Sequence, residues 1–287
     1  MQAFGEECEV SLQPLWTARR GVSYTMRSTA LLLAAASLVS GDDTLWHDTT
    51  AREEPGPGEC GAPAFRRIRY GYTLEGCTTL RMPKVFMGPE GAETLAEQLA
   101  TNTELMALDV EETSIGALGA KALAHALKSN SNSGLVEINV KRNAVGAEGA
   151  RSLAGAIASN GKLEFVGLWD NAIGDEGAKS IAEALKTNRV VNSLILGSNG
   201  IGDAGAKAIA EALAVNRGLV FLSLARNAIG DEGAMALAEA IKGNGVLNGT
   251  SIWKNQMSDQ ATAALQAVLD VPPAERASTF PQPKTEL

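Results

Sequence analysis

The stretch LEFVGLWDNAIGDEGAKSIAEALKTNRV, residues 163–190, carries the pattern that decides the fold. Near its start, Val166 and Leu168 are two residues apart, so both point to the same side of an extended strand. Its second half has apolar residues at the spacing of one buried helix face, namely Ala178, Ile181, Ala182 and Leu185. The stretch therefore predicts one strand followed by one helix.

The same pattern recurs along the chain with a period of 28 residues. The clearest marker is an asparagine at position 9 of each copy, found at Asn143, Asn171, Asn199, Asn227 and Asn255. Seven copies begin at Cys77, Leu105, Leu135, Leu163, Val191, Leu219 and Leu247. One copy cannot bury enough apolar surface to offset the entropy lost on ordering its backbone, so the copies must stack on one another.

This pattern resembles the ribonuclease-inhibitor-like class of leucine-rich repeats, the class also found in NOD-like receptors and in the activating protein for the GTPase Ran. The resemblance covers residues 77 to about 270. It implies an α/β solenoid, or horseshoe, with parallel strands on the concave face and helices on the convex face. Copies at the two ends depart from the pattern, as expected for units that have one face in water.

Three kinds of polar or small residue in the repeat have structural explanations. The asparagines at position 9 are expected to form a ladder that satisfies buried backbone groups in the turn after each strand. Glycines at positions 12 and 15, such as Gly174 and Gly177, are expected to allow a tight turn. Acidic residues beside them, such as Asp175 and Glu176, are expected to favour the helix dipole rather than to bind a metal.

The two ends of the chain lack the repeat. Residues 1–76 are expected to be a poorly ordered leader that includes the N-terminal edge of the fold, and residues 271–287 a disordered tail rich in proline. Residues 26–41 resemble a secretory signal peptide that is preceded by 25 residues. The expected location is the cytoplasm, or the secretory pathway if translation starts at Met26.

Composition excludes several classes of function. A net charge of −8 argues against a nucleic-acid partner, because binding to phosphates needs clustered lysine and arginine. No apolar run is long enough for a membrane-spanning helix. The three cysteines, Cys8, Cys60 and Cys77, have no metal-site spacing and are expected to be unconnected thiols, with a Cys60–Cys77 pair as the alternative.

No set of residues predicts catalysis or a bound cofactor. The two histidines are His47 in the leader and His125 on a predicted helix, and neither accompanies a nucleophile or a metal cluster. The segment 200–205 fits the Gly-x-Gly-x-x-Gly fingerprint, but two of its three glycines are ordinary repeat positions. We therefore predict a protein that is not an enzyme and has neither cofactor nor metal.

The repeats differ most at positions 3, 5 and 7, which alternate with the buried strand positions and should line the concave face. Large apolar residues gather there, and we predict five of them as contacts for a partner protein: Phe165, Trp169, Ile195, Phe221 and Trp253. Gly197 and Ala225 are expected to leave a shallow gap between the two tryptophans. Asp109 and Glu111 would form an acidic end of this surface, with Lys141 beside them.

These observations predict a non-catalytic scaffold that binds a partner protein on the concave face. Two alternatives follow from the resemblance. One is a regulator of a small GTPase, although the long acidic C-terminal tail of the Ran activator is missing. The other is a sensor related to NOD-like receptors, although the chain has no phosphate-binding loop.

Overall fold

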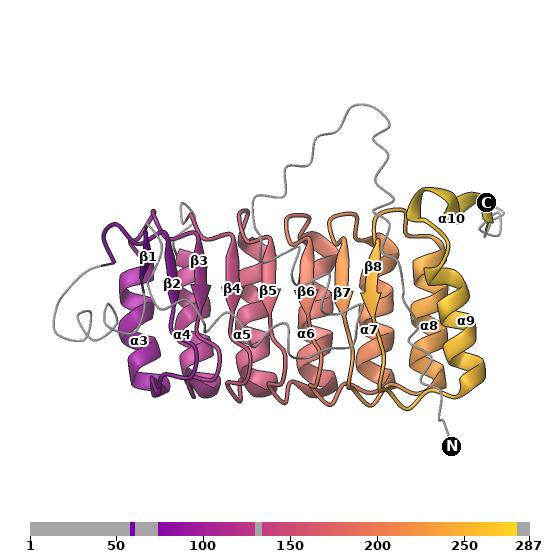
Figure 1. Cartoon of the computed structure of the whole chain (residues 1–287), viewed down its shortest axis with the longest axis horizontal. Coiled ribbons are helices and arrows are strands. Elements are labelled where there is room, and N and C mark those ends of the chain that lie inside the picture. Colours follow the sequence, from indigo (N-terminus) through magenta and orange to yellow (C-terminus); the bar gives the residue numbers. More distant parts are fainter. Residues whose placement is uncertain (1–57, 61–73, 130–133, 280–287) are drawn as a thin grey trace, which may run out of the picture.

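The computed structural model of the protein describes residues 58–60, 74–129 and 134–279 (Figure 1). Its strands are β1 (Glu59–Cys60), β2 (Thr79–Arg81), β3 (Ala107–Asp109), β4 (Glu137–Asn139), β5 (Phe165–Gly167), β6 (Ser193–Ile195), β7 (Phe221–Ser223) and β8 (Gly249–Ser251). Its helices are α3 (Gly88–Leu99), α4 (Gly116–Ser129), α5 (Gly146–Ser159), α6 (Gly174–Thr187), α7 (Asp203–Val215), α8 (Asp231–Lys242), α9 (Asp259–Leu269) and α10 (Pro273–Thr279).

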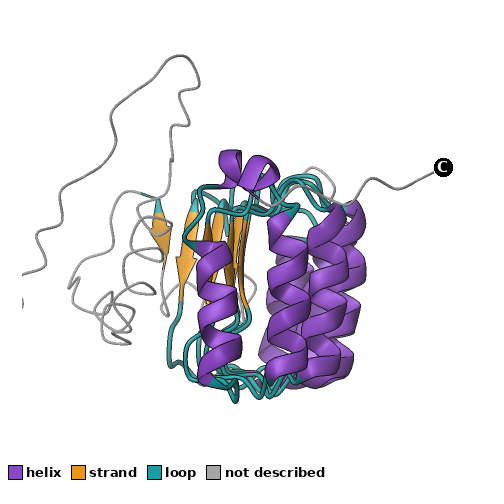
Figure 2. Ribbon diagram, turned by 90° about the vertical axis from the view of Figure 1, so that its right-hand side faces the viewer, coloured by secondary structure: helices purple, strands orange, loops and turns teal. Residues whose placement is uncertain are grey.

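The strands form one parallel sheet in the order of the sequence, from β1 to β8. Each strand from β2 to β8 is followed by a helix, and the helices pack side by side in a second layer (Figure 2). The register does not slip between repeats, because Val166 pairs with Leu194 and Leu194 pairs with Leu222, each at position 4 of its repeat. The predicted α/β solenoid is therefore confirmed.

The main core lies between the two layers. Val166 and Leu168 from the strand segment are buried, and so are Ile181 and Leu185 from the helix that follows. The same positions are buried in the neighbouring repeats, so the core runs through the whole array. Alanines on the buried helix face, such as Ala178, allow each helix to lie close to its neighbours.

The asparagines at position 9 form a continuous ladder in the turns that follow the strands. The Oδ1 atom of Asn199 accepts a hydrogen bond from the backbone N–H of Asn171 at 2.8 Å, and Asn227 does the same for Asn199 at 2.8 Å. The Nδ2 group of Asn199 donates to the carbonyl of Leu168 at 2.8 Å. Each asparagine therefore satisfies backbone groups of two repeats, and four of the five are buried.

A second ladder is made by aspartates at the helix starts. The Oδ1 atom of Asp175 accepts hydrogen bonds from the N–H groups of Gly202 and Gly205 at 2.7 and 2.9 Å. Asp203 makes the equivalent bonds at 2.8 Å to the start of α8. The helix-dipole explanation was therefore incomplete, since each carboxylate caps the helix of the next repeat.

The repeat glycines have two different roles. Gly174 has a φ of 60°, which allows the turn into α6 as expected. Gly177 lies inside the helix, where an added Cβ would come 2.2 Å from Ile173 Cγ2 and 3.0 Å from the Cβ of Ala150 in the preceding helix. Position 15 is thus glycine because two helices approach closely there, and the expectation of a turn at that position was wrong.

The N-terminal edge contains a disulfide bond between Cys60 and Cys77. It links β1 to the segment just before β2, and β1 extends the sheet by one strand beyond the seven repeats. The expectation of unconnected thiols was wrong for these two cysteines.

The C-terminal edge is covered by α10. Its Arg276 side chain is buried and donates hydrogen bonds to the carbonyls of Asn244 and Leu247 at 3.2 and 2.6 Å. The expectation of a disordered tail was therefore wrong for residues 273–279. The remaining tail, the signal-like segment 26–41, Cys8 and His47 lie outside the described residues.

Candidate functional site on the strand face

The candidate site is the surface of the sheet that points away from the helices, here called the strand face (Figure 2). It is formed by positions 3, 5 and 7 of the repeats, because positions 4 and 6 point into the core. The sheet pairing brings the same position of successive repeats side by side, as in Phe165, Ser193 and Phe221. All five predicted contact residues occupy these positions.

Four of the five predicted residues come together in one apolar cluster. Phe165 and Ile195 form its centre, and Trp169 and Phe221 pack against them. We call these four residues the apolar cluster. The expectation that the aromatic side chains are exposed was wrong for Phe165, which is only 3% exposed, and Ile195 is 5% exposed. Trp169 and Phe221 are partly buried and supply the accessible edge of the cluster.

The rings of Trp169 and Phe221 lie across glycines of the next repeat. A Cβ added to Gly197 would come 2.0 Å from Cζ3 of Trp169, and one added to Gly249 would come 2.6 Å from Cδ2 of Phe221. The predicted shallow gap at Gly197 is therefore filled by the indole of Trp169. Gly197 matters because its missing side chain leaves room for the ring.

Trp253 lies outside the apolar cluster. The guanidinium carbon of Arg226 and the ammonium of Lys254 are 5.1 and 4.9 Å from the centroid of its ring. These distances are typical of cation–π contacts. The fifth predicted residue thus belongs to a more basic end of the strand face.

Acidic side chains occupy the other end, over β3 and β4. The Glu111 carboxylate pairs with the ammonium of Lys141 at 3.3 Å, and both side chains are largely buried. The Asp109 carboxylate accepts hydrogen bonds from Asn139 Nδ2 at 3.0 Å and from the N–H of Glu111 at 3.1 Å. The strand face is therefore acidic at one end and apolar in the middle.

Several polar atoms of the strand face are buried without a hydrogen-bond partner among the described residues. They are the hydroxyls of Ser193, Ser223 and Ser251 and the indole N–H of Trp253. Unpartnered buried polar groups are uncommon in folded proteins. These serines are at positions 3 and 5 of their repeats, but the sequence pattern does not indicate that their hydroxyls are buried without partners.

Burial raises the pKa of the Asp109 carboxyl to about 6, and the negative charges of Glu111 and Glu137 add to this effect. The backbone N–H of Glu111 and the positive charge of Arg81 act in the opposite direction. The folded protein therefore keeps Asp109 ionised near neutral pH at a cost in free energy. Carboxyls with a raised pKa are common at functional sites.

Replacing Asp109 with asparagine should raise the free energy of unfolding at pH 7 by roughly 1 to 3 kcal/mol, because one pKa unit corresponds to about 1.4 kcal/mol. A carboxyl whose pKa is higher in the folded chain stabilises the fold when protonated. Stability should thus fall as the pH rises from about 4 to about 6, and Asp109→Asn should lose this dependence. Urea unfolding followed at pH 4, 5, 6 and 7 measures both effects.

Asp270 provides a matched control for this variant. It is exposed, and its carboxylate accepts a hydrogen bond from the Gln266 amide at 2.7 Å, which an asparagine can also accept. Asp270→Asn should leave the pH dependence unchanged. If Asp109→Asn behaved in the same way as Asp270→Asn, the burial of the Asp109 charge would not be significant.

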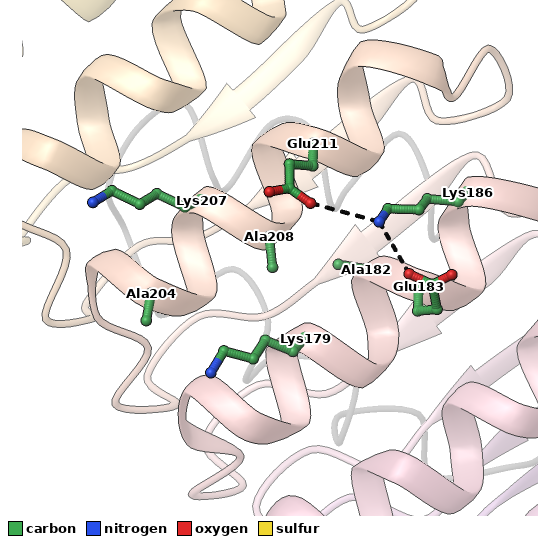
Figure 3. A pocket seen from close by; sticks show the side chains of 8 residues that line it. All are labelled: Lys179, Ala182, Glu183, Lys186, Ala204, Lys207, Ala208 and Glu211. Carbon is green, nitrogen blue, oxygen red and sulfur yellow. Dashed lines mark ion pairs between the residues drawn. The ribbon is translucent and has the colours of Figure 1, made fainter.

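A second surface feature is a groove of about 320 Å³ on the helix side, between α6 and α7. Alanines form its floor, and Figure 3 shows Lys186 reaching Glu183 on its own helix and Glu211 on the next. The other two lysines, Lys179 and Lys207, pair with Glu176 and Glu232 at 2.7 and 2.6 Å. All three cations are thus already neutralised, so the groove is a poor site for an anion.

Other kinds of site find no support in the part of the chain that the structure describes. Within residues 58–60, 74–129 and 134–279, His, Cys, Asp and Glu residues nowhere gather in a group of three or more that could hold a metal ion. In the same residues, no helix combines the length and the hydropathy needed to cross a membrane. His125 is exposed on α4, on the helix side.

A comparison with protein-family models finds the repeat. The family model described as "Leucine Rich repeat" matches residues 131–154, 162–182, 187–210 and 215–238. No curated protein sequence matches the chain.

Solved structures give the following likenesses. A structure titled "Leiomodin-1 Actin-Binding Site 2 (ABS2)" is 24% identical with a TM-score of 0.46, and the match covers 54% of this chain and 90% of that one. The tropomodulin C-terminal domain of Caenorhabditis elegans is 21% identical with a TM-score of 0.47, covering 56% and 96%. A protein from Bacteroides fragilis is 16% identical with a TM-score of 0.41, covering 86% and 83%.

Proposed function

We propose that this leucine-rich-repeat protein is a non-catalytic scaffold that binds a partner protein on its strand face. The observation that carries the proposal is the apolar cluster, which lies on the side of the sheet that the helices do not cover. Contiguous apolar side chains with accessible edges on such a surface are typical of protein–protein interaction sites.

The shape of the cluster suits a binding hot spot. Phe165 and Ile195 are buried, and the side chains of Trp169 and Phe221 pack against them. Rings fixed in this way lose little side-chain entropy on binding, and aromatic residues that are surrounded by well-packed neighbours dominate the energy of many interfaces. Trp169 should therefore contribute more to binding than any other residue of the cluster.

Replacing Trp169 with alanine should weaken partner binding by at least 30-fold, since truncation of a hot-spot residue costs about 2 kcal/mol or more. The full chain and the variant are compared in affinity capture from native extract with quantitative mass spectrometry. Gly197→Ala provides an independent variant, because its Cβ would collide with the indole of Trp169 while leaving that residue's chemistry intact. It should weaken capture of the same protein.

The matched control is Leu118→Ala, which removes an apolar side chain that is 63% exposed on α4. This control should retain the partner fully. Equal capture by the chain, Trp169→Ala and Leu118→Ala would overturn the proposal. A small GTPase among the proteins lost with Trp169→Ala would favour the alternative of a GTPase regulator.

A further inference from the structure

The strand face changes its chemistry along the array, and this change restricts what can bind there. Over β3 and β4 it presents Asp109 and Glu111, and over β5 to β7 it presents the apolar cluster. The two parts are neighbours, because β4 pairs directly with β5. A partner that covers the strand face therefore meets both parts at once.

The acidic part is prepared for a positive charge. Among the described residues, Asp109 accepts hydrogen bonds from neutral donors, Asn139 and the N–H of Glu111, and takes part in no ion pair. Its partly buried carboxyl has a pKa raised to about 6, so it carries its charge at neutral pH at a cost. A cation brought by a partner would offset this cost, whereas an anion would increase it.

The serine hydroxyls of the apolar part do not offer a second contact. The hydroxyls of Ser193 and Ser223 are buried beside the apolar cluster without partners among the described residues, and a partner could not reach them unless neighbouring side chains moved. The accessible edges of Trp169 and Phe221 are therefore the contacts that the apolar part offers.

We infer that the partner presents a segment in which a lysine or arginine lies against Asp109, since Glu111 is already paired with Lys141, and a large apolar side chain lies on the apolar cluster. This inference rests on the proposed function and names the chemistry of the partner. Strands lie about 4.8 Å apart, so β3 is roughly 10 to 14 Å from β5 and β6. An extended chain rises about 3.3 Å per residue, which separates the basic and the apolar residue by roughly three to four positions.

The test is a selection of random linear 12-residue peptides, displayed on phage, against the immobilised full chain. The expected result is enrichment of peptides with a lysine or arginine roughly three to four positions from a tryptophan, phenylalanine, leucine or isoleucine. A selected peptide is then synthesised, and its binding is measured by fluorescence anisotropy. Asp109→Asn should weaken it about 10-fold, Trp169→Ala should abolish it, and the Asp270→Asn control should bind as the unchanged chain does.

The outcomes separate this inference from the proposed function. Peptides that lose binding with Trp169→Ala but bind Asp109→Asn normally, or that lack a basic residue, would overturn the inference and leave the scaffold proposal standing. Peptides that bind Trp169→Ala as well as the unchanged chain would count against both, and so would a selection without enrichment. Binding to the unchanged chain should also weaken as the pH falls below about 6, because Asp109 is then neutral.

Discussion

Replacing Asn199 with alanine should lower the free energy of unfolding by about 3 to 5 kcal/mol. This is the largest change in stability that we predict. The Asn199 side chain accepts one hydrogen bond from Asn171 and donates two, to the carbonyls of Leu168 and Gly197 at 2.8 and 3.1 Å. Alanine would leave the N–H of Asn171 and the carbonyl of Leu168 buried without partners, whereas the carbonyl of Gly197 would keep the bond from the N–H of Asp170 at 2.9 Å. Urea unfolding followed by circular dichroism measures the loss.

Two further variants test whether the ladder causes this loss. Asn192→Ala removes an asparagine of the same repeat whose side chain makes one exposed bond, to Glu164 at 3.2 Å, and should cost less than about 0.5 kcal/mol. Asn199→Thr should recover about half of the loss, because Thr113 occupies position 9 of its own repeat and donates to the carbonyl of Val110 at 2.8 Å. Equal stability of Asn199→Ala and Asn192→Ala would contradict the role of the ladder.

The fold could be predicted from the sequence because each local pattern repeats. A single strand position such as Val166 says little, but the same alternation every 28 residues fixes which side of every strand is buried. The hydrogen-bonding side chain at position 9 could be assigned for the same reason. Stacking then has one solution, since all strands must run parallel and in register.

Contacts between repeats were harder to predict than contacts within one. Asp175 follows the repeat, yet nothing in its own segment indicates that it binds N–H groups about 28 residues later. The burial of Phe165 depends on Ile195 and Trp169, which come from other strands or turns, so its exposure could not be read from alternation alone. Alternation therefore predicted correctly that these residues lie on the strand face, but it did not predict which of them are accessible.

The two edges of the array were predicted least well, because they do not repeat. The short strand β1 and the Cys60–Cys77 bond have no equivalent elsewhere in the described chain that could serve as a template. At the other end, two adjacent prolines and a polar composition favoured disorder. The buried side chain of Arg276 contradicts that expectation. It donates hydrogen bonds to the carbonyls of Asn244 and Leu247, which have no following repeat to supply their donors.

Replacing Arg276 with alanine should lower the free energy of unfolding by about 2 to 4 kcal/mol. The guanidinium donates to the carbonyls of Val271, Asn244 and Leu247, the last at 2.6 Å. Without it, the carbonyls of the last turn lose their donors and α10 loses its attachment. Hydrogen exchange should therefore show early loss of protection in α10 and then in α9, while α5 and α6 stay protected until the array unfolds.

Arg276→Met separates the hydrogen bonds from the packing, because methionine fills a similar volume without donating. Burial lowers the pKa of the Arg276 guanidinium, which means that the protein accommodates this charge at a cost that methionine would remove. We expect methionine to restore less than half of the stability lost in Arg276→Ala, since three carbonyls still lack donors. Full restoration by methionine would show that α10 covers the last repeat by apolar packing alone, and unchanged exchange in Arg276→Ala would show that α10 is not an edge cap.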